Sequence, residues 1–337
     1  MRNKLDLIYR PKTFDDVVAQ SSTIEILKKQ IETRQFKPTY LLCGPSGCGK
    51  TTIARILARE INNGKGSPIE IDCASNNNVE SMREIMADAL KRSLDSEYKV
   101  YIFDEVQILS LQAWNTQLKT IEEPPKNTIF IYCTTDPQKV IPTVLSRVQR
   151  FDFQKIPTND IRDRLKYICE QETIPYKDDA LLYISRLAEG GMRKAIVMLE
   201  KCAGFGEVNI DNVVKAIGTT NYDVLLKLTN SILDYDAKGM IDVIEETFEK
   251  GIDLKEFIDN YILFITELAK FDITHDMNYL SVPPNYEQAF NEIITLKCDR
   301  KFLASFLKKL IELKSIIKWE THPKETIESH LLWLCVE

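Results

Sequence analysis

The chain has 337 residues, of which 44% are apolar and 28% are charged, values typical of a soluble globular protein with two or three domains. It contains no run of about 18 apolar residues and no signal-peptide core near its start, so we exclude a membrane-spanning protein and expect a cytoplasmic one. The net charge of −6 neither supports nor excludes binding to nucleic acid, and the eight cysteines form no C-x-x-C pair, which predicts reduced core thiols rather than a disulfide or zinc framework.

The first strong signal along the chain is a phosphate-binding loop. Residues 44–51 match the pattern G-x-x-x-x-G-K-[ST] at every constrained position. An apolar segment, 39–43, precedes them and a helical pattern, 52–59, follows, which is the order that places phosphate at a helix N-terminus. The loop residues that we expect to bind nucleotide are Gly44, Pro45, Ser46, Gly47, Cys48, Gly49, Lys50, Thr51 and the adjoining Thr52. Lys50 would contact the β- and γ-phosphates, and the Thr51 hydroxyl would bind Mg²⁺.

Short apolar segments alternate with helical patterns up to about residue 153. The continuous apolar run 100–103 is typical of a strand buried on both faces of a parallel sheet. The expected strands are 39–43, 69–73, 100–103, 128–133 and 150–153. The alternation predicts an α/β domain with helices on both faces of the sheet.

Polar residues follow two of these strands. Asp104 and Glu105 come directly after strand 100–103; in a sheet with a phosphate-binding loop, Asp104 would hold Mg²⁺ and Glu105 would orient and deprotonate the attacking water. Thr134 and Thr135 end the next strand, where they would reach the γ-phosphate or that water, or would merely begin a turn. Two single arginines, Arg147 and Arg193, are by themselves better explained as solvated side chains or local ion pairs.

The rest of the chain has helical patterns. Breaks occur at Pro175, at 190–191 and at 204–206, and amphipathic patterns continue from about Asn221 to the end with one interruption at 283–284. We therefore expect an α/β nucleotide-binding domain over 1–156 and two helical domains over 157–219 and 220–337.

Several motifs, in this order, resemble those of the clamp-loader ATPases in the AAA+ class. They are Tyr9-Arg10-Pro11 with Phe14 to Gln20, the phosphate-binding loop, Asp104 to Gln107, Leu118 to Pro125, Thr134 to Lys139, Leu145 to Arg147 and Gly191 to Ala195. Over roughly residues 7–220 the chain is similar to the gamma subunits of bacterial DNA polymerase III and, more distantly, to the small subunits of replication factor C. The resemblance implies an AAA+ module, a small helical lid over 157–219 and an oligomerising helical collar over 220–337.

The resemblance also implies roles for residues that the bare sequence could not assign. The adenine pocket would be lined by Tyr9, Arg10, Pro11, Val17 and Val18. Thr135 would be the first sensor of the γ-phosphate, and Arg193 on the lid would be the second. Arg147 would be an arginine finger that reaches ATP on the neighbouring subunit. The implied catalytic residues are thus Lys50, Glu105, Thr135 and Arg147.

The chain departs from the family pattern at several points. The four-cysteine zinc module is missing, because only residues 62–67 separate the loop helix from the next strand. Gln107 stands where the family usually has His, Lys194 where it usually has Asp, and Val148 replaces the cysteine of the Ser-Arg-Cys motif. None of these changes removes a catalytic group. They predict a compact version without zinc, of the kind that a bacteriophage replisome would encode.

The resemblance implies ATP and Mg²⁺ as ligands and, as partners, neighbouring loader subunits in a pentamer, a sliding clamp and primer–template DNA. The expected activity is ATP hydrolysis in opening the clamp and placing it on DNA. Arg83, Ser110 and Gln112 are candidate DNA contacts, although a solvated helix face explains each equally well. One alternative is a non-catalytic loader subunit, which would typically have lost Lys50 or the acidic pair. Another is a hexameric branch-migration helicase, which the segment 122–125 and the long helical C-terminal region argue against.

Overall fold

The computed structural model describes residues 4–93, 95–217 and 222–335. Its contacts divide the chain into two compact units, Met1–Val208 and Asn209–Glu337. The three-domain division into 1–156, 157–219 and 220–337 stays a prediction, and its boundary at 219/220 lies outside the described residues.

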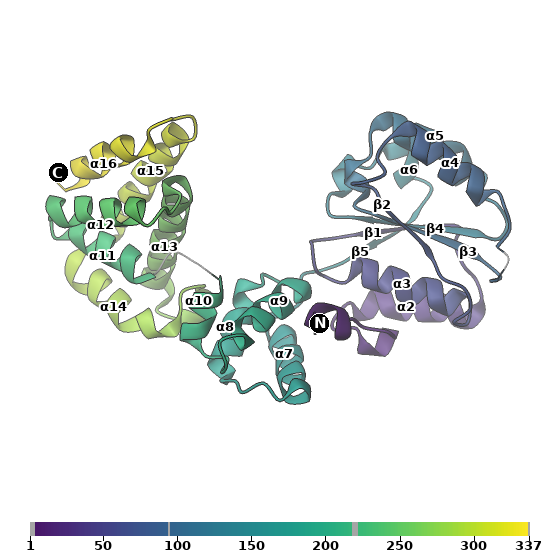
Figure 1. Cartoon of the computed structure of the whole chain (residues 1–337), viewed down its shortest axis with the longest axis horizontal. Coiled ribbons are helices and arrows are strands. Elements are labelled where there is room, and N and C mark those ends of the chain that lie inside the picture. The colour runs from purple at the N-terminus through teal and green to yellow at the C-terminus, as the bar shows by residue number, and fades with distance from the viewer. Residues whose placement is uncertain (1–3, 94, 218–221, 336–337) are drawn as a thin grey trace. The chain divides into compact units, whose positions relative to one another are not determined.

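The first unit is built on a parallel sheet of five strands in the order β2-β3-β4-β1-β5 (Figure 1). The strands are β1 (Thr39–Cys43), β2 (Ile69–Asp72), β3 (Lys99–Asp104), β4 (Thr128–Thr134) and β5 (Gln149–Asp152). Each expected strand is confirmed, with both ends within one residue of the prediction. Because Cys43 lies opposite Thr134 and Asp72 opposite Asp104, the carboxyl ends of these strands share one edge of the sheet.

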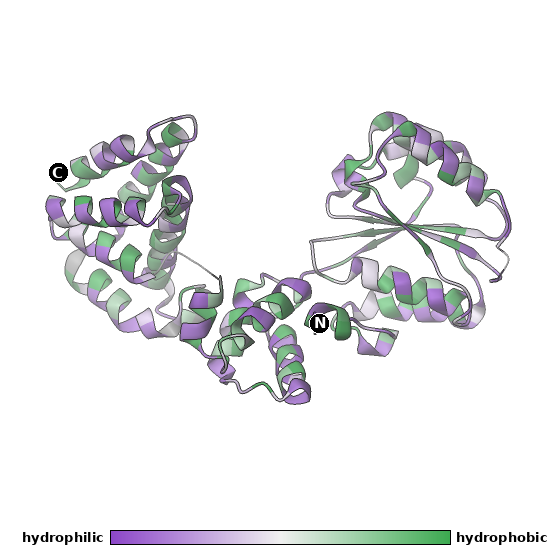
Figure 2. Ribbon diagram, in the orientation of Figure 1, coloured by the Kyte–Doolittle hydropathy of each residue, from purple (hydrophilic) through white to green (hydrophobic). Residues whose placement is uncertain are grey.

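Helices cover both faces of the sheet (Figure 1). On one face lie α2 (Ser21–Thr33) and α3 (Lys50–Ile61), and on the other lie α4 (Val79–Ala89), α5 (Leu111–Glu122) and α6 (Pro142–Leu145). Successive strand residues therefore enter two separate cores: Ile102 packs in the core that includes α3 residues, and Phe103 in the one that includes α4 and α5 residues. The inner strands β1, β3 and β4 are accordingly buried along nearly their whole length, as expected when a parallel sheet is covered on both faces, and the sheet shows long hydrophobic stretches in Figure 2.

Two polar contacts fix the covering helices to the sheet. Asp88 of α4 accepts hydrogen bonds from the Lys99 amine at 2.6 Å and the Tyr101 hydroxyl at 2.7 Å, and these bonds lower the pKa of Asp88. The buried hydroxyl of Tyr132 donates to Gln117 Oε1 of α5 at 2.9 Å. Both contacts satisfy polar groups that would otherwise be costly to bury.

Shorter elements and three further helices complete the first unit. The short ones are α1 (Leu5–Ile8), η1 (Phe14–Asp16), η2 (Val106–Ile108) and η3 (Pro137–Lys139). The helices α7 (Thr158–Glu172), α8 (Asp178–Leu187) and α9 (Met192–Ala203) pack against one another, and α1 packs against α9. The start of the chain is thus joined to a helix almost 190 residues away, since Arg193 and Asp6 are 187 residues apart.

The second unit is helical and has its own core. Its elements are α10 (Ile210–Ile217), α11 (Tyr222–Leu233), α12 (Ala237–Glu249), α13 (Leu254–Thr274), η4 (Met277–Tyr279), η5 (Pro284–Tyr286), α14 (Glu287–Glu292), the π-helical η6 (Ile293–Lys297), α15 (Arg300–Ile317) and α16 (Pro323–Leu334). The central helix is α13, which begins where the Asp253 carboxylate accepts the backbone N–H of Lys255 at 2.8 Å. Its residues Tyr261, Phe264 and Leu268 recur at helical spacing and are buried, which makes α13 the axis of this core.

All eight cysteines are free thiols, as predicted, and seven of them are buried. Within the described ranges, no group of three or more His, Cys, Asp or Glu side chains is arranged to hold a metal ion. In the same ranges, no helix has both the length and the apolar character that crossing a membrane requires.

Candidate active site

The phosphate-binding loop joins β1 to the first turn of α3, and its three glycines have positive φ angles. These are +150° at Gly44, +75° at Gly47 and +102° at Gly49, a region that residues with a side chain rarely adopt. A Cβ on Gly44 would lie 2.6 Å from the carbonyl oxygen of Phe153, so this position has no room for a side chain. A Cβ on Gly49 would meet nothing within 4 Å, so the space beside this glycine is open, as a loop that accommodates phosphate requires.

Lys50 lies at the first turn of α3 with only 7% of its surface exposed. Its amine donates to the carbonyl oxygens of Gly44 and Pro45, each at 2.8 Å. An ammonium group has three N–H donors, so one remains for an anion in this arrangement. Beside it, Cys48 is 1% exposed, and burial raises the pKa of its thiol.

Thr51 and Asp104 meet beside the loop. The Thr51 hydroxyl donates to Asp104 Oδ2 at 2.9 Å, and the other carboxylate oxygen accepts the backbone N–H of Glu105 at 3.1 Å. Burial raises the pKa of Asp104, and the hydrogen bond from Thr51 opposes that rise. A hydroxyl and a carboxylate in contact are the hard oxygen ligands that Mg²⁺ prefers, so the residues present fit this ion.

Glu105 has a left-handed backbone with φ of +56°, which is uncommon for a residue other than glycine. Its carboxylate accepts a hydrogen bond from the Gln107 amide nitrogen. The amide oxygen of Gln107 accepts the Thr134 hydroxyl at 2.9 Å and the backbone N–H of Thr135 at 3.3 Å. The sequence singled out Gln107 only as a departure from a family pattern, whereas here it joins Glu105 to the end of β4.

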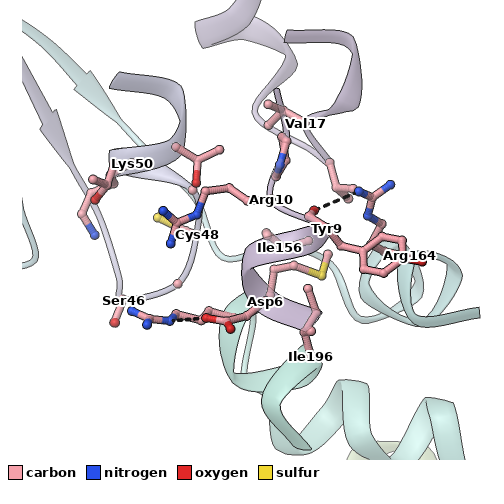
Figure 3. Close-up of a pocket in the computed structure, with 18 of the residues that line it drawn as sticks. Asp6, Tyr9, Arg10, Val17, Ser46, Cys48, Lys50, Ile156, Arg164 and Ile196 are labelled. Atoms are coloured by element: carbon pink, nitrogen blue, oxygen red, sulfur yellow. Dashed lines mark hydrogen bonds and ion pairs between the residues drawn. The ribbon is translucent and has the colours of Figure 1, made fainter. Parts of the chain in front are cut away.

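One pocket brings the N-terminal segment, the loop, the acidic pair and α9 together (Figure 3). The predicted site residues that line it are Tyr9, Arg10, Pro11, Val17, Val18, Ser46, Gly47, Cys48, Gly49, Lys50, Thr51, Thr52, Asp104, Glu105 and Arg193. The loop residues Gly44 and Pro45 are not in the lining, but their carbonyl oxygens accept hydrogen bonds from Lys50. Neither Thr135 nor Arg147 belongs to the lining of this pocket.

The sequence did not predict five of the lining residues: Asp6, Ile156, Arg164, Met192 and Ile196. Ile196 follows Arg193 by three positions on α9, so helical spacing from Arg193 could have found Ile196. Met192 is adjacent to Arg193, and helical spacing from Arg193 does not indicate it. Arg164 gave no such signal, because its partner is a backbone carbonyl.

Helix α7 holds the N-terminal segment through Arg164 and Tyr9. The Arg164 guanidinium donates to the Tyr9 carbonyl oxygen at 3.1 Å (Figure 3). It also lies 5.1 Å from the centre of the Tyr167 ring. The Tyr9 hydroxyl donates to Glu172 at 2.8 Å, and burial together with this bond raises the pKa of Tyr9 to about 12. Tyr9 is thereby positioned from both its backbone and its side chain.

Helix α9 meets the loop and α1 at its first turn. The backbone N–H of Met192 donates to the Gly47 carbonyl oxygen at 3.0 Å, and a Cβ on Gly47 would lie 3.1 Å from the Cα of Gly191. The Arg193 Nε lies 3.0 Å from Asp6 Oδ2, with 70% of the arginine side chain exposed but only 5% of the aspartate side chain (Figure 3). The second oxygen, Asp6 Oδ1, is buried and has no hydrogen-bond partner among the described residues.

The remaining candidates lie elsewhere on the first unit. Arg147, just after α6, contacts Glu122 at 2.9 Å and the Thr143 carbonyl oxygen at 2.7 Å. Arg83 and Gln112 line one surface groove between α4 and α5. Ser110 caps α5, where its hydroxyl accepts the backbone N–H of Ala113 at 3.2 Å.

Two protein-family models match the chain. One, described as "DNA polymerase III, delta subunit", matches residues 69–157. The other, described as "DNA polymerase III clamp loader subunit, ATPase lid domain", matches residues 160–207.

Curated relatives match over longer stretches. The chain is 32% identical to the gamma subunit of DNA polymerase III from Buchnera aphidicola, over 77% of the chain and 79% of that subunit. It is 30% identical to the tau subunit from Bacillus subtilis, over 97% of the chain, and 31% identical to the tau subunit from Escherichia coli, over 79%. The matched regions span 62% and 45% of the lengths of these two tau subunits.

Among solved structures, the RuvB Holliday junction branch migration motor of Thermotoga maritima matches with a TM-score of 0.53. The match covers 73% of this chain and 86% of RuvB at 19% identity, so it bears on the fold alone. The predicted fold class is confirmed: an AAA+ module with a parallel sheet is followed by a helical lid and a helical C-terminal region.

Proposed function

The chain belongs to the family of DNA polymerase III gamma and tau subunits, and we propose that it is an ATP-hydrolysing subunit of a sliding-clamp loader. One observation carries the proposal. The pocket in the first unit gathers the phosphate-binding loop, the acidic pair at the end of β3 and an arginine of the lid. A protein that only bound nucleotide would not need Glu105, a carboxylate suited to activating water.

The pocket suggests how the nucleotide is held. Adenine would lie against Tyr9, Arg10, Pro11, Val17 and Val18, with backbone groups contacting the base. The phosphates would lie on the loop amides and the α3 N-terminus, where the helix dipole favours negative charge. Arg193 would contact the γ-phosphate within the same subunit, since its guanidinium projects from the lid into the pocket lining.

Hydrolysis would depend on a small number of groups in this chain. Thr51 and Asp104 would hold Mg²⁺, which neutralises charge on the phosphates when it is bound. Lys50 would donate its remaining N–H to a phosphate oxygen, and Glu105 would accept the proton of the attacking water. Thr135 would sense the γ-phosphate from the end of β4.

Arg147 would act on a neighbouring subunit. It is absent from the pocket lining and contacts Glu122 and Thr143 instead, which supports a role between subunits. Such a finger is worth about 10³–10⁵ in hydrolysis rate. Hydrolysis would then require assembly.

The partners follow from the family. We expect loader subunits in a pentamer held by a helical collar over 220–337, a sliding clamp, and primer–template DNA in the cytoplasm. Arg83, Gln112 and Ser110 remain the candidate DNA contacts, and the shared groove of Arg83 and Gln112 supports them as a pair. Primed DNA would trigger hydrolysis and release of the closed clamp.

Two other functions are less well supported. A non-catalytic loader subunit would not need Lys50, Thr51, Asp104 and Glu105 together in one pocket. A branch-migration helicase has the fold in its favour, but RuvB is 19% identical, against 32% for the gamma subunit from Buchnera aphidicola.

The first test is Lys50→Ala in the loader complex that co-purifies with this chain. Turnover of ATP stimulated by clamp and primed DNA should fall to background, because the loop loses its only side-chain cation for the phosphates. Lys29→Ala, on an exposed position of α2, is the matched control and should leave turnover unchanged. Stimulated turnover that survives Lys50→Ala would refute the catalytic assignment.

The second test separates the two halves of the shared site. Arg147→Ala should leave ATP binding close to that of the wild type but block hydrolysis at the neighbouring site. Mixing Arg147→Ala with Lys50→Ala subunits should restore turnover only where an intact loop meets an intact finger. The control is Arg162→Ala, an arginine of α7 that pairs with its neighbour Asp163 at 2.8 Å. Hydrolysis by Arg147→Ala complexes at the wild-type rate would contradict the role in trans.

A further inference from the structure

Gln107 makes hydrogen bonds with both ends of its amide. Its Nε2 donates to a carboxylate oxygen of Glu105, and its Oε1 accepts from the Thr134 hydroxyl and the Thr135 backbone N–H. The residue lies in η2, two positions beyond Glu105, while Thr134 is the last residue of the neighbouring strand β4 and Thr135 follows it. One side chain therefore joins two segments that follow different strands.

The chemistry of the partners fixes the orientation of this amide. A backbone N–H can only donate, so the group that faces Thr135 must be the amide oxygen. The NH₂ group then faces Glu105, whose ionised carboxylate can only accept. If the amide were inverted, its NH₂ group would face the Thr135 N–H, which is also a donor, and its oxygen would face the Glu105 carboxylate, which is also an acceptor. The orientation of the amide therefore follows from its partners and does not depend on distinguishing nitrogen from oxygen.

The contact also leaves Glu105 able to react. Gln107 bonds to Oε2 of the carboxylate, and Oε1 has no hydrogen bond among the described contacts. A neutral amide donor holds the carboxylate in place without protonating it. The backbone of Glu105 is already set by its left-handed φ of +56°, so the amide fixes the part of the residue that remains free to rotate.

We propose that Gln107 is a positioning residue, which sets the carboxylate of Glu105 at a fixed place relative to the end of β4, where Thr135 senses the γ-phosphate. This inference rests on the proposed ATPase function. Glu105 would take the proton from water, and Gln107 would act only through Glu105 without touching the nucleotide, since it is absent from the pocket lining. Displacing a reacting group by about 1 Å can cost 10²-fold in rate, so the contact matters to turnover without adding to binding.

Three substitutions test the contact in the stimulated loader complex. Gln107→Met keeps the side-chain length and removes both ends of the hydrogen bonding. Gln107→Glu keeps acceptors for β4 but cannot donate to an ionised Glu105. Thr134→Val replaces a fully buried threonine by a residue of the same shape and removes the hydroxyl that donates to Gln107. Gln138→Met, at an exposed position beyond β4, is the control.

The readouts are single-turnover hydrolysis of ATP and the affinity for a fluorescent ATP analogue. We expect Gln107→Met and Gln107→Glu to slow hydrolysis by about 10- to 100-fold, with affinity within about twofold of the wild type. Thr134→Val should slow hydrolysis alone but add little in the Gln107→Met background, because both changes break the same chain of contacts.

Three outcomes would overturn the inference: wild-type turnover by Gln107→Met or Gln107→Glu, a loss of affinity that accounts for the whole loss of rate, or additive effects of Gln107→Met and Thr134→Val. The Lys50→Ala complex is measured beside them. If it also hydrolyses ATP, the proposed function has failed, and the result says nothing against Gln107 in particular.

Discussion

The ion pair between Arg193 and Asp6 predicts an asymmetric effect of mutation on stability. Arg193 is largely exposed, whereas the Asp6 side chain is 5% exposed and one of its oxygens has no hydrogen-bond partner among the described residues. Arg193→Ala would therefore leave a buried carboxylate without its cation. The same change in an Asp6→Asn background would leave a neutral amide, which costs far less to bury.

The magnitude follows from the distance and the exposure. Two unit charges 3.0 Å apart attract by about 5 kcal/mol at an effective dielectric constant of 20. With 70% of the arginine side chain exposed, solvent screens most of that attraction. We expect Arg193→Ala to reduce the free energy of unfolding by about 1–2 kcal/mol more with Asp6 present than with Asn at position 6.

Urea unfolding without nucleotide measures this difference in the free energy of unfolding. Tryptophan fluorescence reports on the first unit, which contains Asp6 and Arg193. Trp114 is 1% exposed in the core of the first unit, whereas Trp319 and Trp333 in the second unit are 83% and 69% exposed. The emission change should therefore follow unfolding around Trp114.

The control for this cycle is Lys194→Ala, since the adjacent Lys194 pairs with Glu189 at 3.5 Å on the surface. That substitution should shift stability by less than about 0.5 kcal/mol. Equal destabilisation by Arg193→Ala in the two backgrounds would refute the argument that Asp6 is a buried charge held by Arg193.

Three further predictions use the same unfolding assay. Tyr132→Phe should cost about 1–3 kcal/mol, because the oxygen of Gln117 stays buried without its donor; no change would show that water replaces the hydroxyl. Gly44→Ala should cost about 1–3 kcal/mol and reduce ATP binding, because the new methyl group would strike the Phe153 backbone; wild-type stability would contradict this crowding. Asp88 has a lowered pKa in the folded state, so its contribution is present above the unfolded pKa of about 3.9 and is lost as the pH falls through the lower folded value. Asp88→Asn should therefore flatten the loss of stability between about pH 5 and pH 3; an unchanged acid profile would count against it.

Local patterns predicted most of the sheet and the loop. The inner strands β3, β4 and β1 could be recognised because both of their faces are covered, so each is a mostly apolar run such as 100–103. The edge strands β2 and β5 each bury a single residue and gave a weaker signal. The loop could be recognised because backbone angles like those of Gly44 and Gly49 restrict the residue type at fixed spacing. The closeness of Thr51 and Asp104 could be predicted from the loop and the strands together, because parallel strands end at a common edge of the sheet.

The contacts that complete the pocket depend on distant segments. Asp6 lies in a four-residue helix, too short to give a periodic signal, and it meets Arg193 only after the lid packs against it. Arg164 binds the backbone carbonyl of Tyr9, which any residue would offer. Gln107 looked like a simple replacement, because a sequence cannot show that one amide is shared between two strands.

The burial of Cys48 has a consequence for how this molecule would respond to thiol reagents. The residue lies inside the phosphate-binding loop, so alkylation there would block the nucleotide site. Burial both covers the sulfur and raises its pKa, which keeps it in the unreactive protonated form at neutral pH. Maleimides should therefore inactivate the protein slowly, at a rate set by how often the loop opens. The rate at which Cys48 is alkylated therefore measures how often the loop opens, and bound nucleotide should lower that rate.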